Sequence, residues 1–204
     1  MIPLGYLLRK VMRTSKHLIL GSLLVLTANV LAAQQVGGLV VEYIPAFQEN
    51  PQKAQSWQAK MNPELQSMIR DFQIFEAAGN SGMNELRILK FQYNSQIRGT
   101  IDASASETVD NVARLPGIKN PSQRIVAIKV SGQEARRISF ESDRNGGRLG
   151  AEFLIIQDSK RQTLYQVQVI FSKKPSVNPL SSLSLSEQQM IAKVILDSVR
   201  IERP

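Results

Sequence analysis

Residues 135–156, ARRISFESDRNGGRLGAEFLII, decide the fold class of this chain. Two runs rich in β-branched and aromatic residues, 135–141 and 151–156, flank Asn145-Gly146, and an Asn-Gly pair in this setting is the strongest local signal for a β-hairpin. The second run is apolar at 153–156 without a break, so we expect its strand to be covered on both faces. The segment therefore predicts a hairpin inside a sheet.

Strand signals continue on both sides of this hairpin. Alternating or β-branched residues predict strands in further segments: 39–44, 86–93, 125–130, 164–171 and 199–201. The alternation within 125–130 turns Val126, Ile128 and Val130 toward the core. Consecutive strands that are joined by hairpins usually pair with each other, so the sheet is predicted to be antiparallel.

Two extra helices are predicted before the main strands. Asn50-Pro51 and Asn62-Pro63 each combine an N-cap residue with a proline at the first helical position. The second helix is predicted to run as far as Phe72, with an apolar stripe of Leu65, Met68, Ile69 and Phe72. Trp57 and Met61 extend this apolar spacing, which is more typical of a core than of an exposed ridge for a partner.

Two more helices are predicted around the central strands. One begins at Ser104, because Ser104 and Glu107 have the spacing of a capping box. The last begins at Ser186, with Gln189 as its capping partner and a buried side formed by Met190, Ile191, Val194 and Ile195. Strands in the middle with helices beside them indicate an α+β fold, in which helices flank an antiparallel sheet.

The first residues have the layout of a secretory signal peptide. They include no acidic residue but several basic ones, Arg9, Lys10, Arg13 and Lys16. An apolar run follows, and small residues precede a cleavage point between Ala32 and Ala33. We expect residues 1–32 to be removed on export, with Met12 as a candidate true start. The alternative is an inner-membrane anchor through residues 18–33, which is short for a span of about 20 apolar residues.

Export fixes the compartment and limits the chemistry. A single α+β domain would remain, 33–204, in which 33–85 hold the first strand and the extra helices and 86–204 hold the sheet core and the last helix. Cleavage removes His17, the only histidine, and the chain has no cysteine. The usual zinc sites and a lipoprotein anchor are therefore excluded, no cofactor is predicted, and the expected location is the periplasm.

Positive charge is concentrated in one part of the chain. Residues 119–174 hold 11 basic and 5 acidic residues. This region could face an anionic membrane surface, a cell-wall polymer or an acidic partner, or form only a solvated basic surface. Nucleic acid is not expected, because the protein is exported and no stacking aromatics lie between the basic residues.

Residues 141–152 match a calcium-binding loop in part. Oxygen-bearing side chains occupy ligand positions of the EF-hand pattern: Glu141, Asp143, Asn145 and Glu152. The flanking segments have the character of strands instead of helices, and Arg144 and Arg148 place positive charge within the loop. A hairpin without a metal is therefore the prediction, and calcium stays a weak alternative.

Signals for catalysis are weak. Ser81 lies in a Gly-Asn-Ser-Gly turn similar to the nucleophile loop of serine proteases, but no histidine remains to act as its base. Glu141 and Asp143 are expected on one strand face, but no second acidic cluster or sugar-stacking aromatic accompanies them as in glycoside hydrolases. No catalytic residue is predicted.

The element order from about 86 to 201 resembles that of PsbP-like and DcrB-like α+β sandwich domains. The matching features are the segment GQEA at 132–135, the strand LYQVQVIF at 164–171 and the closing segment ILDSVRI at 195–201. Residues 45–85 depart from the pattern because their helices are longer than the usual N-terminal hairpin. The resemblance implies a non-enzymatic accessory module that binds a protein partner.

The expected function is that of an exported, non-enzymatic accessory or binding protein of the bacterial envelope, with an unidentified envelope protein as its partner. One alternative is a carrier of a small apolar ligand or lipid, which requires an apolar cavity of roughly 300 Å³ or more. A hydrolase without His or Cys chemistry is the remaining alternative.

Overall fold

The computed structural model describes residues 32–43, 47–77, 83–93, 100–173 and 183–202. By its internal contacts the chain divides into two units, 1–31 and 32–204, and all the described residues belong to the second unit. The predicted signal peptide therefore lies outside the described residues, apart from Ala32 at its end.

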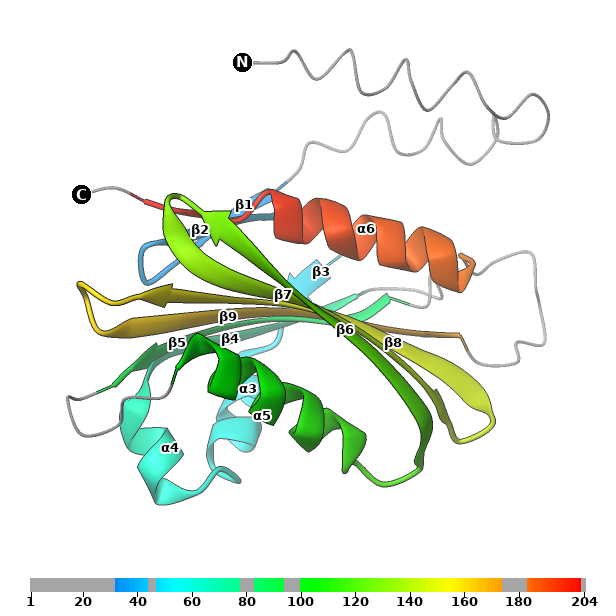
Figure 1. The fold of residues 1–204 in the computed structure, drawn as a ribbon. Helices are drawn as coiled ribbons and strands as arrows, with labels where there is room; N and C mark the ends of the chain where they lie inside the picture. Colours follow the sequence, from blue (N-terminus) through cyan, green and yellow to red (C-terminus); the bar gives the residue numbers. More distant parts are fainter. Residues whose placement is uncertain (1–31, 44–46, 78–82, 94–99, 174–182, 203–204) are drawn as a thin grey trace, which may run out of the picture. The chain divides into compact units, whose positions relative to one another are not determined.

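Most of the unit is one antiparallel sheet of seven strands (Figure 1). Its order is β3-β4-β5-β9-β8-β7-β6, and the strands are β3 (Phe47–Glu49), β4 (Ile69–Ala77), β5 (Met83–Gln92), β9 (Thr163–Lys173), β8 (Gly147–Asp158), β7 (Gln133–Arg144) and β6 (Ile118–Val130). A smaller sheet has the order β1-β2-β10, with β1 (Ala32–Val36), β2 (Leu39–Tyr43) and β10 (Arg200–Ile201). The predicted α+β class is confirmed.

The predicted hairpin is confirmed residue by residue. β7 and β8 pair in continuous register as far as Arg144 and Gly147, which leaves Asn145 and Gly146 as the two turn residues. Their φ angles are 50° and 78°, the left-handed conformation that a tight hairpin turn requires. Asn and Gly tolerate this conformation better than other residues, so the local sequence explains the turn.

The two extra helices begin where the Asn-Pro pairs predict, but the second is shorter. α3 (Pro51–Gln58) is capped by Asn50 and α4 (Pro63–Met68) by Asn62, whose side chain accepts a hydrogen bond from the Leu65 amide. The prediction that the second helix reaches Phe72 is wrong, because Ile69–Ala77 forms β4 and pairs with β5 along its length. Pairing in the sheet outweighs the helical spacing of the apolar residues.

The other two helix starts are also displaced from their predicted positions. α5 (Ile101–Ala113) is capped by Thr100 and not by Ser104. α6 (Leu185–Asp197) starts with a complete capping box of Ser184 and Glu187, two residues before the predicted Ser186. The predicted buried side of α6 is confirmed in part: Ile195 is buried and Ile191 packs partly against the core, but the other buried residues are Gln188, Ala192 and Leu196.

Met190 and Val194 lie on the outer side of α6, with exposed fractions of 56% and 54%. A small residue, Ala192, and an amide side chain, Gln188, take the places against the sheet instead. An apolar pattern does not detect such residues, which is why the prediction was wrong for Met190 and Val194.

Each face of the large sheet has its own core. One core includes Leu154 and Ile156 and lies with α6 and the small sheet. The other includes Phe153 and Ile155 and lies with α5. The expectation that 153–156 are covered on both faces is therefore confirmed.

Candidate functional site

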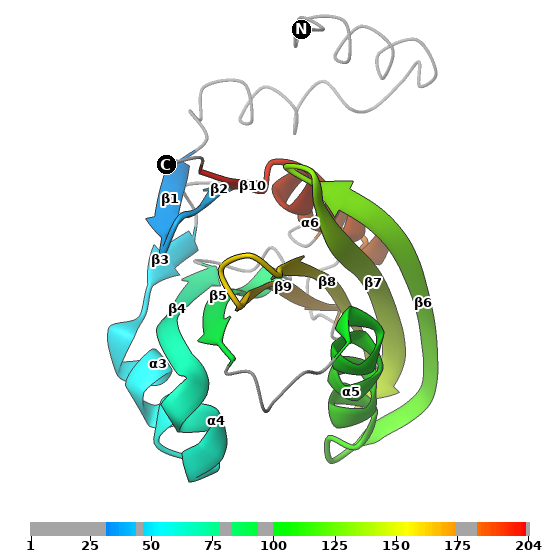
Figure 2. The same ribbon diagram turned by 60° about the vertical axis from the view of Figure 1, so that its left-hand side comes forward.

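The most distinctive exposed feature of the described chain is strand β6. It pairs with β7 on one side, and no described strand pairs with its other side. Figure 2 shows β6 at the outer margin of the sheet, whereas α5 and α6 lie nearer its inner strands. All residues from Lys119 to Ala127 are exposed, and only Ile118, Ile128 and Val130 are half-buried. β6 is thus a long strand with a free edge.

The position of the helices explains this exposure. α6 packs mainly on β8 and β9. α5 packs mainly on β7 and also contacts β8 and β6, but residues 119–127 of β6 stay exposed. Ile125 has an exposed fraction of 39% and Val126 of 37%. Ile128 and Val130 pack partly against the core, as predicted, but the prediction that Val126 points into it is wrong. The alternation of apolar residues predicted the strand, but it did not show that this strand lies at the edge of the sheet.

The charge of β6 is entirely positive. It carries Lys119, Arg124 and Lys129 and no acidic residue, and none of the three forms an ion pair within the described ranges. Other basic residues of the 119–174 region are neutralised by carboxylates, in the pairs Arg136–Asp102, Arg137–Asp197, Arg148–Glu141 and Arg161–Asp158. The excess charge of this region is therefore located partly on the free edge.

A second polar cluster lies where α3 meets β4 and β5. Lys53 forms ion pairs with Glu76 and with Glu85, the second at 2.6 Å. Arg87 donates a hydrogen bond to Glu85 at 2.7 Å, and its guanidinium lies 4.5 Å from the centre of the Trp57 ring. Each charge has an opposite partner, so the cluster holds α3 against the sheet and leaves no charged group unpaired for chemistry.

The pKa directions agree with this role. Hydrogen bonds from Lys53 and Asn50 lower the pKa of Glu76 below its ordinary value. Burial lowers the pKa of Lys53, but hydrogen bonds to Glu76 and Glu85 outweigh burial and raise it overall. Both groups are therefore held in their charged forms, which is the opposite of what a general acid or base needs near neutral pH.

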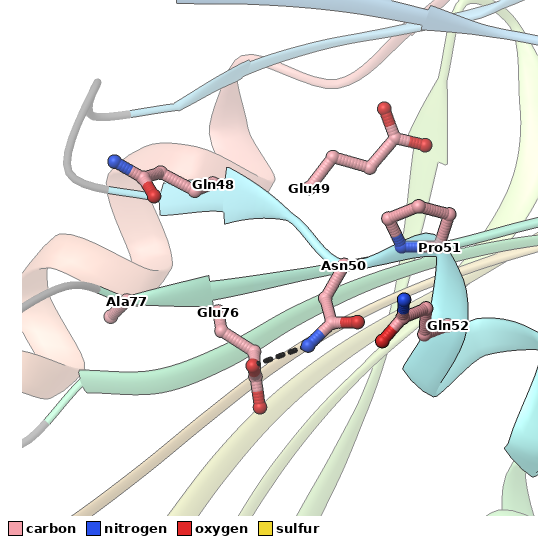
Figure 3. A pocket seen from close by; sticks show the side chains of 7 residues that line it. All are labelled: Gln48, Glu49, Asn50, Pro51, Gln52, Glu76 and Ala77. Carbon is pink, nitrogen blue, oxygen red and sulfur yellow. Dashed lines mark hydrogen bonds between the residues drawn. The ribbon is translucent and has the colours of Figure 1, made fainter.

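A cavity of about 340 Å³ lies beside this cluster (Figure 3). Its lining is largely polar and includes the side chains of Glu49, Asn50, Gln52 and Glu76. The carrier alternative requires an apolar cavity, and the character of this lining does not support it. The dashed line in Figure 3 shows that Asn50 donates a hydrogen bond to Glu76, at 2.7 Å.

A buried carboxylate lies on the α6 side of the sheet. Glu152 on β8 is fully buried and accepts hydrogen bonds from Ser139 and Gln189, each at 2.9 Å. The Arg137 side chain lies 3.9 Å from it and also binds Asp197 near the end of α6. A buried polar group is tolerated when it is hydrogen-bonded, and the hydrogen bonds of Glu152 join α6 to the sheet.

The weak calcium candidates do not converge on one point. Glu141 and Asp143 lie on one face of β7, where Arg148 contacts both, at 2.9 Å and 3.5 Å. Asn145 is in the hairpin turn, and Glu152 is turned toward Ser139 and Gln189. Within the described ranges, no group of three or more His, Cys, Asp or Glu residues is arranged to hold a metal ion.

Other sequence candidates fall inside and outside the described residues. Ser81 and His17 lie outside them, whereas Ala32 and Ala33 begin β1.

Trp57 is 41% exposed and stacks edge-on against Phe72, with ring centres 6.2 Å apart. The expected core position of Trp57 is therefore wrong, and its ring lies at the surface. No helix of the described segments is long and apolar enough to cross a membrane.

The free edge was missed in the sequence, although two signals indicate it. Pro121 interrupts the register between Lys119 and Ser122, and proline within a strand is typical of sheet edges. Three basic residues and no acidic one within a single strand also indicate contact with solvent on both faces.

Comparisons with known proteins identify a fold but no family. No family model matches the chain, and no curated protein matches its sequence. The Ran-binding protein Mog1p of Saccharomyces cerevisiae superposes with a TM-score of 0.51 at 6% identity, over 84% of this chain and 96% of that chain.

Two further solved structures superpose with a TM-score of 0.43. They are the protein of unknown function PA94 from Pseudomonas aeruginosa, at 15% identity over 85% of this chain and 98% of that chain, and LpqN from Mycobacterium tuberculosis, which is involved in cell envelope biogenesis, at 9% identity over 86% and 87%. The likeness to Mog1p shows that this chain has an α+β fold of the same kind, with helices on a large antiparallel sheet.

Proposed function

We propose that this protein is an exported, non-enzymatic binding protein of the bacterial envelope, and that it holds a partner protein on the free edge of its sheet. The observation that carries the proposal is strand β6, which exposes Lys119–Ala127 without a break and has no described neighbour on its outer side. A free edge of this length is a template for pairing with another chain. Pro121 and the basic side chains of β6 limit which chain can pair there, and the regular part of the edge is 122–130.

The chemistry of the remaining surface supports binding over turnover. The charged groups that do come together, Lys53, Glu76, Glu85 and Arg87, neutralise one another and bind α3 to the sheet. Glu152 is fully buried and hydrogen-bonded. Neither arrangement offers the poised acid, base or nucleophile in an open cleft that a hydrolase needs.

Export is supported by the N-terminal sequence alone, that is, by the basic start, the apolar run 18–31 and the small residues at Ala32 and Ala33. The mass of the intact protein isolated from its host tests this part of the proposal. A chain that starts at Ala33 supports a periplasmic protein, and a chain that retains residues 1–32 supports the inner-membrane anchor instead.

Kinship with the PsbP-like and DcrB-like domains is part of the same proposal. It is supported by the order of elements, since α5, the β6–β9 hairpins and α6 follow each other as in the resemblance. The α+β sandwich fold that this kinship requires agrees with the superposition on Mog1p. Homologous sequences that connect this chain to either group would test it.

The binding function is tested by site-specific photo-crosslinking in the host cell. The crosslinking residue replaces Ile125 on β6 in one variant and Leu65 on α4 in a matched variant, because the two side chains have almost equal exposure, 39% and 40%. A crosslinked protein is identified by mass spectrometry and then recombined with the purified protein. We expect a complex through position 125, and a protein that forms no complex from either position would contradict the function.

A further inference from the structure

We propose that β6 takes up an extended segment of its partner as an additional strand, and that this segment carries two acidic residues that bracket four apolar ones. This inference rests on the proposed binding function and adds the chemical class of the partner. The part of β6 that can pair is 122–130, which follows the irregularity at Pro121 and keeps regular register with β7 up to Val130. It contains neither proline nor glycine.

The backbone of 122–130 provides the affinity. In an antiparallel pair, alternate residues of an edge strand direct their N–H and C=O groups away from the neighbouring strand. On β6 these groups have no described strand to pair with. An incoming extended segment would bind to them through main-chain hydrogen bonds, as in other cases of strand addition to a sheet edge. The free length exceeds the usual strand of about 5–6 residues.

The side chains of 122–130 provide the selectivity. Arg124 and Lys129 bracket four apolar residues, Ile125–Ile128. Residues directly opposite each other on neighbouring strands lie on the same face and contact each other, and opposite charges at such positions attract. The complementary strand therefore carries an acidic residue opposite Arg124, an acidic residue opposite Lys129 and apolar residues between them. The order of acidic and apolar residues is the same whether the partner strand runs parallel or antiparallel to β6.

The two basic residues are not equivalent. Arg124 is opposite Ser139 on β7, whereas Lys129 is opposite Glu134, which offsets part of its charge. Arg124 lies on the same face of the sheet as Val126, which is the face on which α6 packs further in. Lys129 lies on the face of Ile125, which is the face on which α5 packs. The acidic residue opposite Arg124 is therefore the stronger anchor of the two.

A second copy of this chain fits the edge less well. β6 has three basic residues and no acidic residue, so pairing two copies would gather positive charge without neutralising it. Like charges on adjacent strands are destabilising. An acidic and apolar segment of another protein is the occupant that the charge of β6 favours.

The probe is a fluorescent synthetic peptide with glutamate, four valine or isoleucine residues and glutamate at its centre, flanked by neutral residues so that it spans 122–130. Its binding to the full-length protein is measured by anisotropy. We expect Arg124→Glu to weaken binding by about tenfold and Lys129→Glu to weaken it less, because attraction across the strand pair becomes repulsion. We also expect the double variant to prefer a peptide with lysine in place of both glutamates.

The matched control is Arg144→Glu, which reverses an exposed charge at the end of β7 and outside the proposed segment. It should leave binding unchanged. Hydrogen exchange by NMR gives an independent result, because an added strand protects alternate amides of 122–130 and no others. Failure of the peptide to bind, equal binding by the wild type and the double variant, or protection elsewhere would overturn the proposal.

Anionic lipid is tested in the same experiment with vesicles that contain phosphatidylglycerol. If the vesicles bind through Arg124 and Lys129 while the peptide does not, the edge faces a membrane and the proposal of strand addition is wrong. A partner crosslinked from Leu65 but not from Ile125 would also overturn strand addition while leaving the binding function intact. Failure of the binding function itself would appear as no complex from either position.

Discussion

Two long strands of one sheet, β8 and β6, have opposite surroundings. β8 has 12 residues and β6 has 13, and only β7 separates them. Residues 149–156 of β8 are all buried, whereas no residue of β6 is. The cause is the placement of α5 and α6, which cover the inner strands and leave the middle of β6 open (Figure 2).

The difference means that hydrophobic burial, and therefore stabilisation, is concentrated in β8, whereas the proposed binding uses β6. The free energy of hydrophobic burial grows with the apolar area removed from water, so Phe153 and Ile155 on β8 stabilise the fold and Ile125 on β6 contributes little. β-branched residues occur in both strands. In β8 their presence is explained by the core, and in β6 it agrees with the proposed addition of a partner strand.

The largest expected effect is on the β8 side of this comparison. Phe153→Ala removes a fully buried ring from the core under α5 and should lower the free energy of unfolding by about 3–5 kcal/mol. Ile125→Ala is the matched change on β6 and should cost less than about 0.5 kcal/mol. Unfolding in urea, followed by circular dichroism, measures both. An equally large loss for Ile125→Ala would mean that β6 belongs to the core.

A second prediction concerns a close contact between β8 and β9. A Cβ atom on Gly150 would lie 2.1 Å from the Phe171 ring, which is almost fully buried. Gly150→Ala should therefore lower the free energy of unfolding by about 1–3 kcal/mol, because the ring cannot move without disturbing its neighbours. Combining it with Phe171→Leu should recover part of that loss in a double-mutant cycle. Full additivity would contradict the contact.

A third and smaller effect is expected at the turn that leads into β7 from β6. Gly132 has a φ of 83°, and a Cβ atom there would meet nothing within 4 Å. Gly132→Ala should cost only the backbone strain, about 1 kcal/mol. Gly132→Asn should cost less, because Asn tolerates this conformation. Equal losses in thermal unfolding for the two variants would argue against backbone strain as the cause.

Local sequence signals predicted the structure correctly where the backbone conformation depends on a few adjacent residues. The turn at Asn145-Gly146 and the caps at Asn50 and Asn62 were predicted correctly, because each depends on residues adjacent in the chain. Residues 69–72 were predicted as the end of a helix and belong to strand β4, since their conformation depends on pairing with β5, whose partner residues lie 17–22 positions further along the chain. The burial of Gln188 in α6 has the same origin in tertiary packing.

The candidate site was only partly visible in the sequence, for a related reason. The alternation of Val126 and Ile128 predicts a strand that is buried on one face, and it cannot show that no helix covers Val126. The basic character of 119–174 was visible in the sequence. Arg136 and Arg137 on β7 bind carboxylates, whereas the basic residues of β6 form no ion pair among the described residues, and this separation depends on which carboxylates lie nearby.

The smallest expected effect lies at the border between the covered and the open parts of the sheet. Arg136 on β7 has Ile155 of β8 on one side and Ala127 of β6 on the other, and it donates hydrogen bonds to Asp102 of α5 at 2.7 Å and 3.1 Å. The Arg136 hydrogen bonds lower the pKa of Asp102. The unfolded chain therefore binds the proton more readily, so this pair stabilises the fold above the ordinary Asp pKa of about 3.9 and stops doing so as the pH falls through the lower folded value.

In Asp102→Asn this contribution is absent at every pH. The difference in free energy of unfolding between wild type and variant should therefore be small and constant above about pH 5 and should shrink toward zero in acid. Asp110→Asn, in the same helix and 3.9 Å from Arg114, is the matched control and should change the pH profile less. Parallel pH profiles for Asp102→Asn and wild type down to acid pH would show that the Arg136–Asp102 pair does not hold α5 against β7. The boundary between the covered strands and the open strand β6 would then depend on apolar packing alone.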